Sequence, residues 1–445
     1  MLNRLLFTKM DNAPLVIFRV FFGILVSLEC YGAILTGWVK RILIDPQFTF
    51  TFIGFEWLQP LPGNGMYFYF FLMGSLGVCM ALGYKYRLSA IAFLLLWSGV
   101  YFMQKSAYNN HYYLLVLIAG FMALFPAHKS CSIDARQRPS IRSEAMYSYV
   151  KWIVVAQLLI VYTYASIAKL YADWLDFGII RILMQNKAHY VLIGDLLQEP
   201  WVHKTIGVFG ILFDLLIVPA LLWKPTRKIA FSISIFFHVF NSLVFQIGIF
   251  PYLSLAFSVF FFEPEIIRNI FLKRKKSYTL NKVIVPGYKN VLLTCLGLYF
   301  VIQIGLPLRH HFFTDHVLWT EEGHRLSWRM MLRSRAGDTR FYVVDKNTET
   351  QTLVHLKDYL TEKQIARLSS YPDFMWQFAQ YLKKEYRKVG QEVAVYVVSD
   401  VSINGKPART FIDPKVDLAS VPWHHFKHND WILPSEKMEL QKSQQ

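Results

Sequence analysis

The chain has few of the residues that stabilise small secreted proteins or carry their sugars. Only four cysteines occur among 445 residues. Cys30, Cys79 and Cys295 lie in apolar runs and Cys131 lies in a basic loop, so their spacing indicates neither a disulfide framework nor a metal site. They are expected to be small hydrophobic residues, and no metal is predicted. The sequence also lacks an Asn-x-Ser/Thr sequon, which favours a chain that never meets the glycosylation machinery.

Charged residues are scarce as well, at 17% of the chain, whereas 54% is hydrophobic and 17% is aromatic. This composition excludes an ordinary soluble protein. The apolar residues gather in nine runs, several of them close to the ~20 residues that cross a bilayer as a helix. The eighth run is short and can be re-entrant, so eight spans are the alternative to nine. The runs cover residues 14–35, 66–83, 88–104, 111–126, 146–169, 201–223, 229–248, 250–262 and 291–307. Residues 40–62 and 170–200 are amphipathic rather than spanning.

The net charge of +17 is unevenly distributed along the chain. From Arg309 onward, 20 Lys and Arg nearly balance 17 Asp and Glu, so residues 1–308 carry most of the excess. Within that part the basic residues concentrate in alternate loops, which is typical of orientation in a membrane and argues against binding to nucleic acid. The rule that positive loops stay inside predicts a cytoplasmic N-terminus. Nine crossings then place the C-terminal domain on the periplasmic or luminal face.

The C-terminal part, residues 308–445, has the alternating patterns of a soluble domain with mixed α/β structure. Residues 341–345 and 393–403 are predicted strands, and Asn404-Gly405 predicts a tight hairpin turn into residues 408–412. Residues 361–368 and 373–388 are predicted helices, with Gly390 after the second. The sequence therefore predicts an α-helical multi-pass membrane bundle over residues 1–307, with eight or nine spans, followed by this α/β domain.

Ionisable groups inside apolar runs are candidates for function because burying them is costly. Pairing between helices explains many such residues, and it is the preferred explanation for Arg19, Glu29 and Asp214. The full set is Arg19, Glu29, His111, Lys169, Asp214 and His238, with the amide of Asn241 beside them.

Lys169 and His111 differ from the rest, because the predicted helix directions bring both to the outer side of the membrane. A lysine in an apolar pocket can give up its proton readily enough to act as a base near neutrality. Asp173, four residues further on, is a possible partner that would keep the proton on Lys169. From the residues alone, a catalytic and a structural role for Lys169 remain equally open.

Several ordered strings resemble those of the vitamin K-dependent gamma-glutamyl carboxylase family, whose membrane part is an HTTM domain. Two of them contain the histidine and the lysine: Ala-Tyr-Asn-Asn-His-Tyr at residues 107–112 and Lys-Leu-Tyr-Ala-Asp-Trp at residues 169–174. The others lie at residues 237–242 with 247–250, at residues 327–335, and at residues 413–417. The resemblance extends over about residues 13–433, so it covers both predicted domains.

The resemblance implies a coupled reaction. In it, Lys169 deprotonates reduced vitamin K, a hydroquinone, whose anion reacts with O₂. The resulting strong base removes a γ-proton from a glutamate of a peptide or protein, CO₂ adds to the carbanion, and the quinol leaves as its epoxide. His111 is implied to handle the carbanion and its proton. Supporting roles are implied for Asn109, Asn110, His238, Asn241, Met330 and Met331 at the quinone, and for Arg335 and Lys415 at the glutamate carboxylate.

Two departures from the animal members limit what the resemblance implies. Ala168 stands where they have a second lysine, and Arg333 stands where they have a histidine. They also continue past the end of this chain with a region that engages propeptides, so a bacterial inner-membrane member is expected. Two alternatives therefore stay open: a quinol epoxidase without productive carboxylation, and a non-enzymatic quinone-binding or transport protein. The inverted repeats typical of transporters are not found in the sequence.

Overall fold

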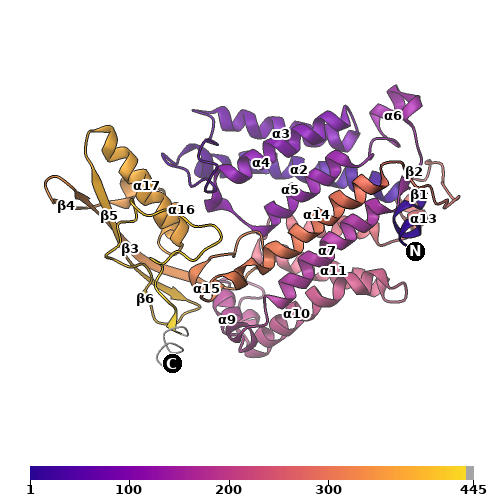
Figure 1. Ribbon diagram of the computed structural model, residues 1–445. Coiled ribbons are helices and arrows are strands. Elements are labelled where there is room, and N and C mark those ends of the chain that lie inside the picture. The colour runs from indigo at the N-terminus through magenta and orange to yellow at the C-terminus, as the bar shows by residue number, and fades with distance from the viewer. Residues whose placement is uncertain (437–445) are drawn as a thin grey trace.

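The computed structural model describes residues 1–436 as a helical bundle joined to a small sheet domain (Figure 1). In this part of the chain, seven helices are long and apolar enough to cross a membrane, or eight if one bent pair is a single span. The chain is thus an integral membrane protein, as predicted. The seven are α2 (Ala13–Leu35), α3 (Gly65–Leu82), α4 (Tyr86–Met103), α7 (Tyr149–Ile167), α10 (Pro200–Leu222), α11 (Arg227–Phe240) with its continuation η5 (Asn241–Phe245), and α14 (Lys289–Leu308).

Two of the nine predicted runs form helices that do not cross by themselves. Helix α5 (Asn110–Leu124) has 15 residues, fewer than the ~20 that a span needs. Helix α12 (Phe250–Phe257), extended by η6 (Ser258–Phe260), bends by 117° into α13 (Pro264–Phe271). A proline at the first position of α13 favours this break, because it can start a helix but cannot continue one.

Helix α2 is the most buried of the seven spans and packs closely on α3. A Cβ atom on Gly23 would lie 2.5 Å from the backbone nitrogen of Ala81, so only glycine permits this approach. Two intramembrane charges have internal partners here. The Arg19 guanidinium donates to the carbonyls of Ala127, Ser130 and Cys131 at 2.7–3.2 Å, and Glu29 accepts from the Tyr112 hydroxyl at 2.7 Å. Both contacts agree with the pairing role expected for these residues.

The soluble domain is built on a four-stranded antiparallel sheet in the order β4-β3-β5-β6. Its strands are β3 (Arg335–Asp345), β4 (Gln351–Leu353), β5 (Val393–Ile403) and β6 (Arg409–Thr410). Strands β3 and β5 pair along their full length, from Arg335 opposite Ile403 to Asp345 opposite Val393. Helices α16 (Glu362–Leu368) and α17 (Pro372–Lys388) lie beside the sheet (Figure 1). The predicted α/β domain is therefore present, with β4 as an additional short strand.

Local signals in this domain act as predicted. Asn404 and Gly405 have φ values of +54° and +76° between Ile403 and Lys406, as a type I′ turn requires. Thr361 begins α16 with a capping box, in which the side chains of Thr361 and Gln364 each accept a hydrogen bond from the other residue's backbone nitrogen. The remaining short elements are α1 (Leu2–Phe7), β1 (Lys9–Asp11), η1 (Lys40–Ile44), η2 (Lys105–Ala107), α6 (Ile133–Gln137), η3 (Pro139–Ile141), β2 (Ala145–Tyr147), α8 (Ala172–Leu175), α9 (Gly178–Gln185), η4 (Leu196–Gln198), η7 (Arg309–Phe312), α15 (Val317–Thr320) and η8 (Leu356–Asp358).

The segment between α2 and α3 joins the two domains. Phe50 belongs to the hydrophobic core of the soluble domain, with Phe48 packed against it, and the Phe50 ring lies 4.6 Å from that of Phe374 on α17. Other apolar residues of the segment 40–62, Ile42 and Leu43, pack in the core of the bundle, so its amphipathic pattern reflects contacts with both domains. This contact fixes the soluble domain over the ends of α4 and α5, where the candidate site lies.

Candidate functional site

A largely apolar cavity of about 500 Å³ lies between α9, α10, α11 and the start of the soluble domain. Binding sites for small organic ligands commonly measure ~300–1,000 Å³ and have mostly apolar walls with a few polar groups. The wall here is mainly aliphatic and aromatic. Its polar residues are His111, Tyr162, Lys169, Thr205, Asp214 and Asn241.

Lys169 and Asp214 form a buried ion pair in the wall of this cavity. Lys169 follows the end of α7, and Asp214 lies in the middle of α10. The Lys169 Nζ donates to the Asp214 carboxylate and, at 3.1 Å, to the carbonyl of Ala165. The two side chains are only 9% and 8% exposed. Because both charges lose most of their contact with water, the pair is costly unless its geometry and its other hydrogen bonds compensate for the lost hydration.

Asp173 does not pair with Lys169, contrary to the possibility raised from the sequence. It instead binds the turn after β5, accepting from Lys406 and Asn404 at 2.8 Å each. Asp173 therefore ties the membrane domain to the soluble domain. The i,i+4 spacing failed as a guide because the chain leaves the helix after Ile167, which separates the two side chains.

His111 stands where the apolar cavity meets a second, polar cavity. Its ring stacks on Phe250 with 4.3 Å between ring centroids, and it lines both cavities, as do Met330 and Met331. The described residues give its ring nitrogens no hydrogen-bond partner. His111 is thus held by packing, with its nitrogens available to a ligand in either cavity.

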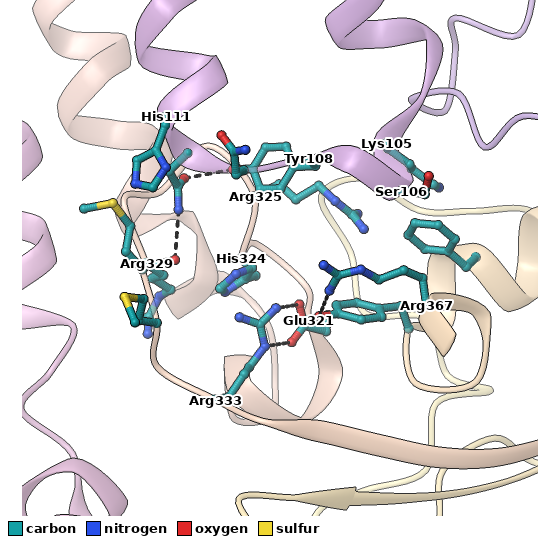
Figure 2. Close-up of a pocket in the computed structure, with 16 residues that line it drawn as sticks. Lys105, Ser106, Tyr108, His111, Glu321, His324, Arg325, Arg329, Arg333 and Arg367 are labelled. Carbon is teal, nitrogen blue, oxygen red and sulfur yellow. Dashed lines mark hydrogen bonds and ion pairs between the residues drawn. The ribbon is translucent and has the colours of Figure 1, made fainter. Parts of the chain in front are cut away.

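The polar cavity measures about 210 Å³ and lies between η2, the start of α5 and the soluble domain (Figure 2). Four arginines line it together with a lysine, two histidines and one carboxylate. Such a concentration of positive charge in a partly enclosed site favours an anionic ligand. The ionisable residues are Lys105, His111, Glu321, His324, Arg325, Arg329, Arg333 and Arg367, with Tyr108 and Tyr371 beside them.

Two carboxylates neutralise part of this charge. Asp373 accepts two bonds from Arg325 at 2.7 and 3.1 Å and pairs with Lys105 at 2.6 Å. Although burial raises the pKa of Asp373, these two cations outweigh it and lower the pKa to about 2. Glu321 accepts two bonds from Arg333 (Figure 2). These cations are therefore held by internal partners.

Arg329 and Arg367 make no ion pair with a carboxylate in the described part of the chain. Arg329 contacts the Nε2 of His310 at 2.8 Å, and Arg367 donates to the Tyr371 hydroxyl at 3.0 Å. Burial lowers the pKa of Arg329 to about 10, so it keeps its charge near neutrality. Burial and the surrounding arginines hold the pKa of His324 well below its usual value, so His324 is neutral. Arg329 and Arg367 are thus the cations most available to an anionic ligand.

The loop that separates the two cavities has an unusual backbone. Leu326, Trp328 and Met331 have φ values of +60°, +58° and +57°. A residue other than glycine at positive φ costs about 1–3 kcal/mol, and it keeps this conformation only where surrounding contacts hold it. Asn110 supplies one such contact by donating to the carbonyl of Arg329 at 2.9 Å. The Trp328 ring stacks on Tyr113 with 4.9 Å between centroids.

The other predicted site residues lie at different distances from the two cavities. Asn241 lines the apolar cavity, whereas Asn109 lines the polar one and begins α5 by accepting from the backbone nitrogen of Tyr112. His238 lies behind the apolar wall, where its Nε2 is 3.2 Å from the Tyr162 hydroxyl. These positions leave the proposed quinone contacts as predictions.

Arg335 and Lys415 line neither of these two cavities. The Arg335 guanidinium is buried and donates to the carbonyls of Leu318, Trp319 and Ser370 at 2.6–2.9 Å. Lys415 is exposed in the segment after β6. A contact of either residue with a carboxylate substrate therefore stays a prediction, and the geometry gives Arg335 internal acceptors instead.

The sequence patterns did not single out Lys105, Arg325, Arg329 or Arg367, which line the polar cavity. Asp214 was recognised as an intramembrane charge, but its partner depends on how α7 and α10 pack. The signal for the polar cavity is present in residues 321–335, where acidic and basic residues crowd together directly after the last span. Their dense and unequal charge is the feature that points to an anion site.

Comparison with known proteins gives two matches that together cover nearly the whole chain. The family model described as HTTM domain matches residues 7–265. The family model described as vitamin K-dependent gamma-carboxylase, lumenal domain, matches residues 288–438. No solved structure matches the chain. The boundary between the two matches falls before α14, so this helix is grouped with the soluble domain.

Proposed function

Because the chain belongs to the vitamin K-dependent gamma-carboxylase family, we propose that it couples epoxidation of a reduced quinone to carboxylation of glutamate in a peptide or protein. One observation carries this proposal. An apolar cavity that contains Lys169 and a cationic cavity suited to a carboxylate share His111, Met330 and Met331 in their walls. The two halves of the reaction thereby have adjacent compartments.

The apolar cavity suits a reduced quinone. Its volume of about 500 Å³ accommodates a fused two-ring head group, and aromatic residues such as Phe237 and Phe240 line it. A hydroxyl of such a ring needs a polar partner in an otherwise apolar site, and Lys169, Asp214 and Asn241 provide candidates. Met330 and Met331, being flexible and polarisable, suit contact with a ring or its apolar tail.

The ion pair gives Lys169 a route to act as a base. A buried pair in an apolar site is penalised for both charges, so transfer of one proton from Lys169 to Asp214 produces a neutral amine and a neutral acid without separating charge. The amine then accepts a proton from a quinol hydroxyl at Nζ, and Asp214 is the residue that makes this possible. When bound, the reduced quinone and O₂ supply the strong base that removal of a γ-proton requires.

The polar cavity suits the glutamate side chain. Arg329 and Arg367 offer guanidinium groups that do not pair with an internal carboxylate, and charge-assisted bonds of this kind orient carboxylates well. His111, at the junction, lies where a γ-carbon held by these cations would meet the quinone cavity. Stacking of His111 on Phe250 in a largely apolar wall limits access of water, which protects a strong base.

A second candidate is quinol epoxidation without carboxylation. Arg333 stands in place of the histidine of the animal members, and its guanidinium, which pairs with Glu321, keeps its proton and cannot act as an acid or base there. This replacement changes the cavity proposed for glutamate and leaves the cavity that contains Lys169 unchanged. We also propose that the site faces the periplasm or lumen and that the quinone is reduced vitamin K.

The proposal is tested with purified protein, reduced vitamin K, labelled bicarbonate and a Glu-rich peptide, with epoxide and fixed label measured separately. The proposal requires both products from the wild type and neither from Lys169→Ala, with a loss of about 10²–10⁴-fold, as typical for a general base. Epoxide without fixed label would support the second candidate. An unchanged rate of both products in Lys169→Ala would overturn the assignment of the base.

A further inference from the structure

We propose that the chain has a binding site for an anionic phospholipid at the end of the bundle remote from the soluble domain. The site is a groove of about 870 Å³ between the end of α3, the segment that contains α6, and the end of α13 with the residues that follow it. In Figure 1, α6 and α13 lie at the right of the bundle, whereas the sheet domain lies at the left. The groove is therefore separate from the two cavities of the candidate site.

The groove carries unneutralised positive charge. Arg136, Lys273 and Arg274 line it, are exposed, and make no ion pair with any residue that the structure describes. Arg142 also lines it but pairs with Glu144 at 3.0 Å. No lining residue is acidic. Guanidinium and ammonium groups around one concave surface favour a phosphate, which accepts several charge-assisted bonds at once.

The same groove has apolar walls, which distinguish a lipid from a soluble phosphate. Leu82, Ile270 and Phe271 line it with exposed side chains, at 52%, 59% and 48%. Leu82 ends a membrane-spanning helix, so this wall lies where a span reaches the membrane surface. A diacyl lipid meets both requirements, since its phosphate contacts the cations while its chains run along the apolar residues.

Helix α13 is placed to form the floor of such a site. It is bent by 117° from α12, so it does not continue the direction of that span. A short amphipathic helix that turns away at the end of a span is typical of the membrane interface. Its last residues, Ile270 and Phe271, line the groove with exposed apolar side chains next to Lys273 and Arg274.

A buried ion-pair network holds the chain segment that carries two of the groove's cations, Lys273 and Arg274. Lys275 is fully buried and pairs with Asp11 at 2.8 Å and with Glu144 at 3.1 Å. Asp11 also accepts from the backbone nitrogen of Tyr278 at 2.9 Å. This network fixes the backbone of residues 273–275, so binding a phosphate there immobilises little additional chain.

Loop charge predicts that this face is cytoplasmic, and anionic lipids attract juxtamembrane basic residues at such a surface. Each lysine or arginine near an anionic surface strengthens binding by about fivefold. Replacing Arg136, Lys273 and Arg274 together by glutamine should therefore weaken lipid binding by about a hundredfold.

The test measures binding of dioleoylphosphatidylglycerol to the full chain in detergent by native mass spectrometry, with dioleoylphosphatidylcholine and glycerol 3-phosphate as comparison ligands. The matched control replaces Arg138, Lys228 and Lys276, which are exposed and basic but do not line the groove, by glutamine. We expect one saturable phosphatidylglycerol site, weaker binding of phosphatidylcholine, and the hundredfold loss only in the groove variant. Equal losses in both variants would mean general attraction to the basic surface and would overturn the proposal. Binding of glycerol 3-phosphate as tight as that of the lipid would also overturn it, because the apolar walls would then contribute nothing.

Discussion

Lys169 and Asp214, 45 residues apart in sequence, form an ion pair in the wall of an apolar cavity. The pair connects the end of α7 to the middle of α10 and accounts for a carboxylate placed within a membrane-spanning helix. It also means that Lys169 cannot be considered as an isolated amine. Any base function at this position involves both residues.

Breaking this pair should affect stability and activity in separable ways. Asp214→Asn leaves the lysine charge without its partner and should cost about 3–5 kcal/mol, seen as a lower midpoint of thermal unfolding, with loss of epoxide formation. The double variant Lys169→Met with Asp214→Leu should recover most of the stability, because no buried charge remains, but no activity. A double variant that still forms epoxide would contradict the role of the pair.

The anion site should depend on Arg329 more than on Arg335. Arg329→Gln removes a cation that lacks a carboxylate partner and should raise the peptide KM by about 10–100-fold, in line with the ~1.5–3 kcal/mol of a charged hydrogen bond. Epoxide formation without peptide should change little. Arg335→Lys is the comparison: its guanidinium serves backbone carbonyls, so this variant should lower thermal stability and reduce both activities together. A selective KM effect in Arg335→Lys alone would restore Arg335 as the substrate contact.

The pH dependence of stability should reveal the His428–Glu322 pair in the soluble domain. His428 Nδ1 lies 2.6 Å from a Glu322 oxygen, and this hydrogen bond raises the pKa of His428 above 6.5. A raised pKa in the folded state adds stability that is complete below about pH 6.5 and is lost as the pH rises through the folded value. The unfolding midpoint of the wild type should therefore exceed that of His428→Gln most at low pH. A gap that widens above pH 8 would contradict this reading.

Topology is tested by reporter fusions. We expect an alkaline phosphatase fused after Leu433 to be active, because that enzyme needs the oxidising periplasmic or luminal side, and one fused in the loop after Gln137 to be inactive. The reverse pattern would place the soluble domain, and with it both cavities, in the cytoplasm.

The sequence predicted the parts of this fold that local chemistry determines. Spans follow from apolar length, and the turn at Asn404-Gly405 and the cap at Thr361 follow from the conformations that those side chains favour. Strands β1, β2 and β4 escaped prediction because three residues are too few for an alternating pattern to appear.

The candidate site could be predicted only where a residue and its neighbours in sequence carry the signal. Lys169 and His111 were singled out as ionisable groups at the outer ends of apolar runs, and the strings around them then added the family resemblance. Lys105 pairs with Asp373, 268 positions away, and Asp214 meets Lys169 only after α7 and α10 have packed. These contacts depend on tertiary packing, which no local pattern specifies.

The central claim, that two reactions share the junction at His111, is tested most directly by the ratio of epoxide formed to CO₂ fixed in His111→Ala. Lys169 and the quinone cavity remain in this variant, so quinol oxidation should continue. Carboxylation should fall by about 10²–10⁴-fold, the usual range for a lost acid or base, and the ratio should rise accordingly. An unchanged ratio, with both products lost or both retained in a folded variant, would contradict the account.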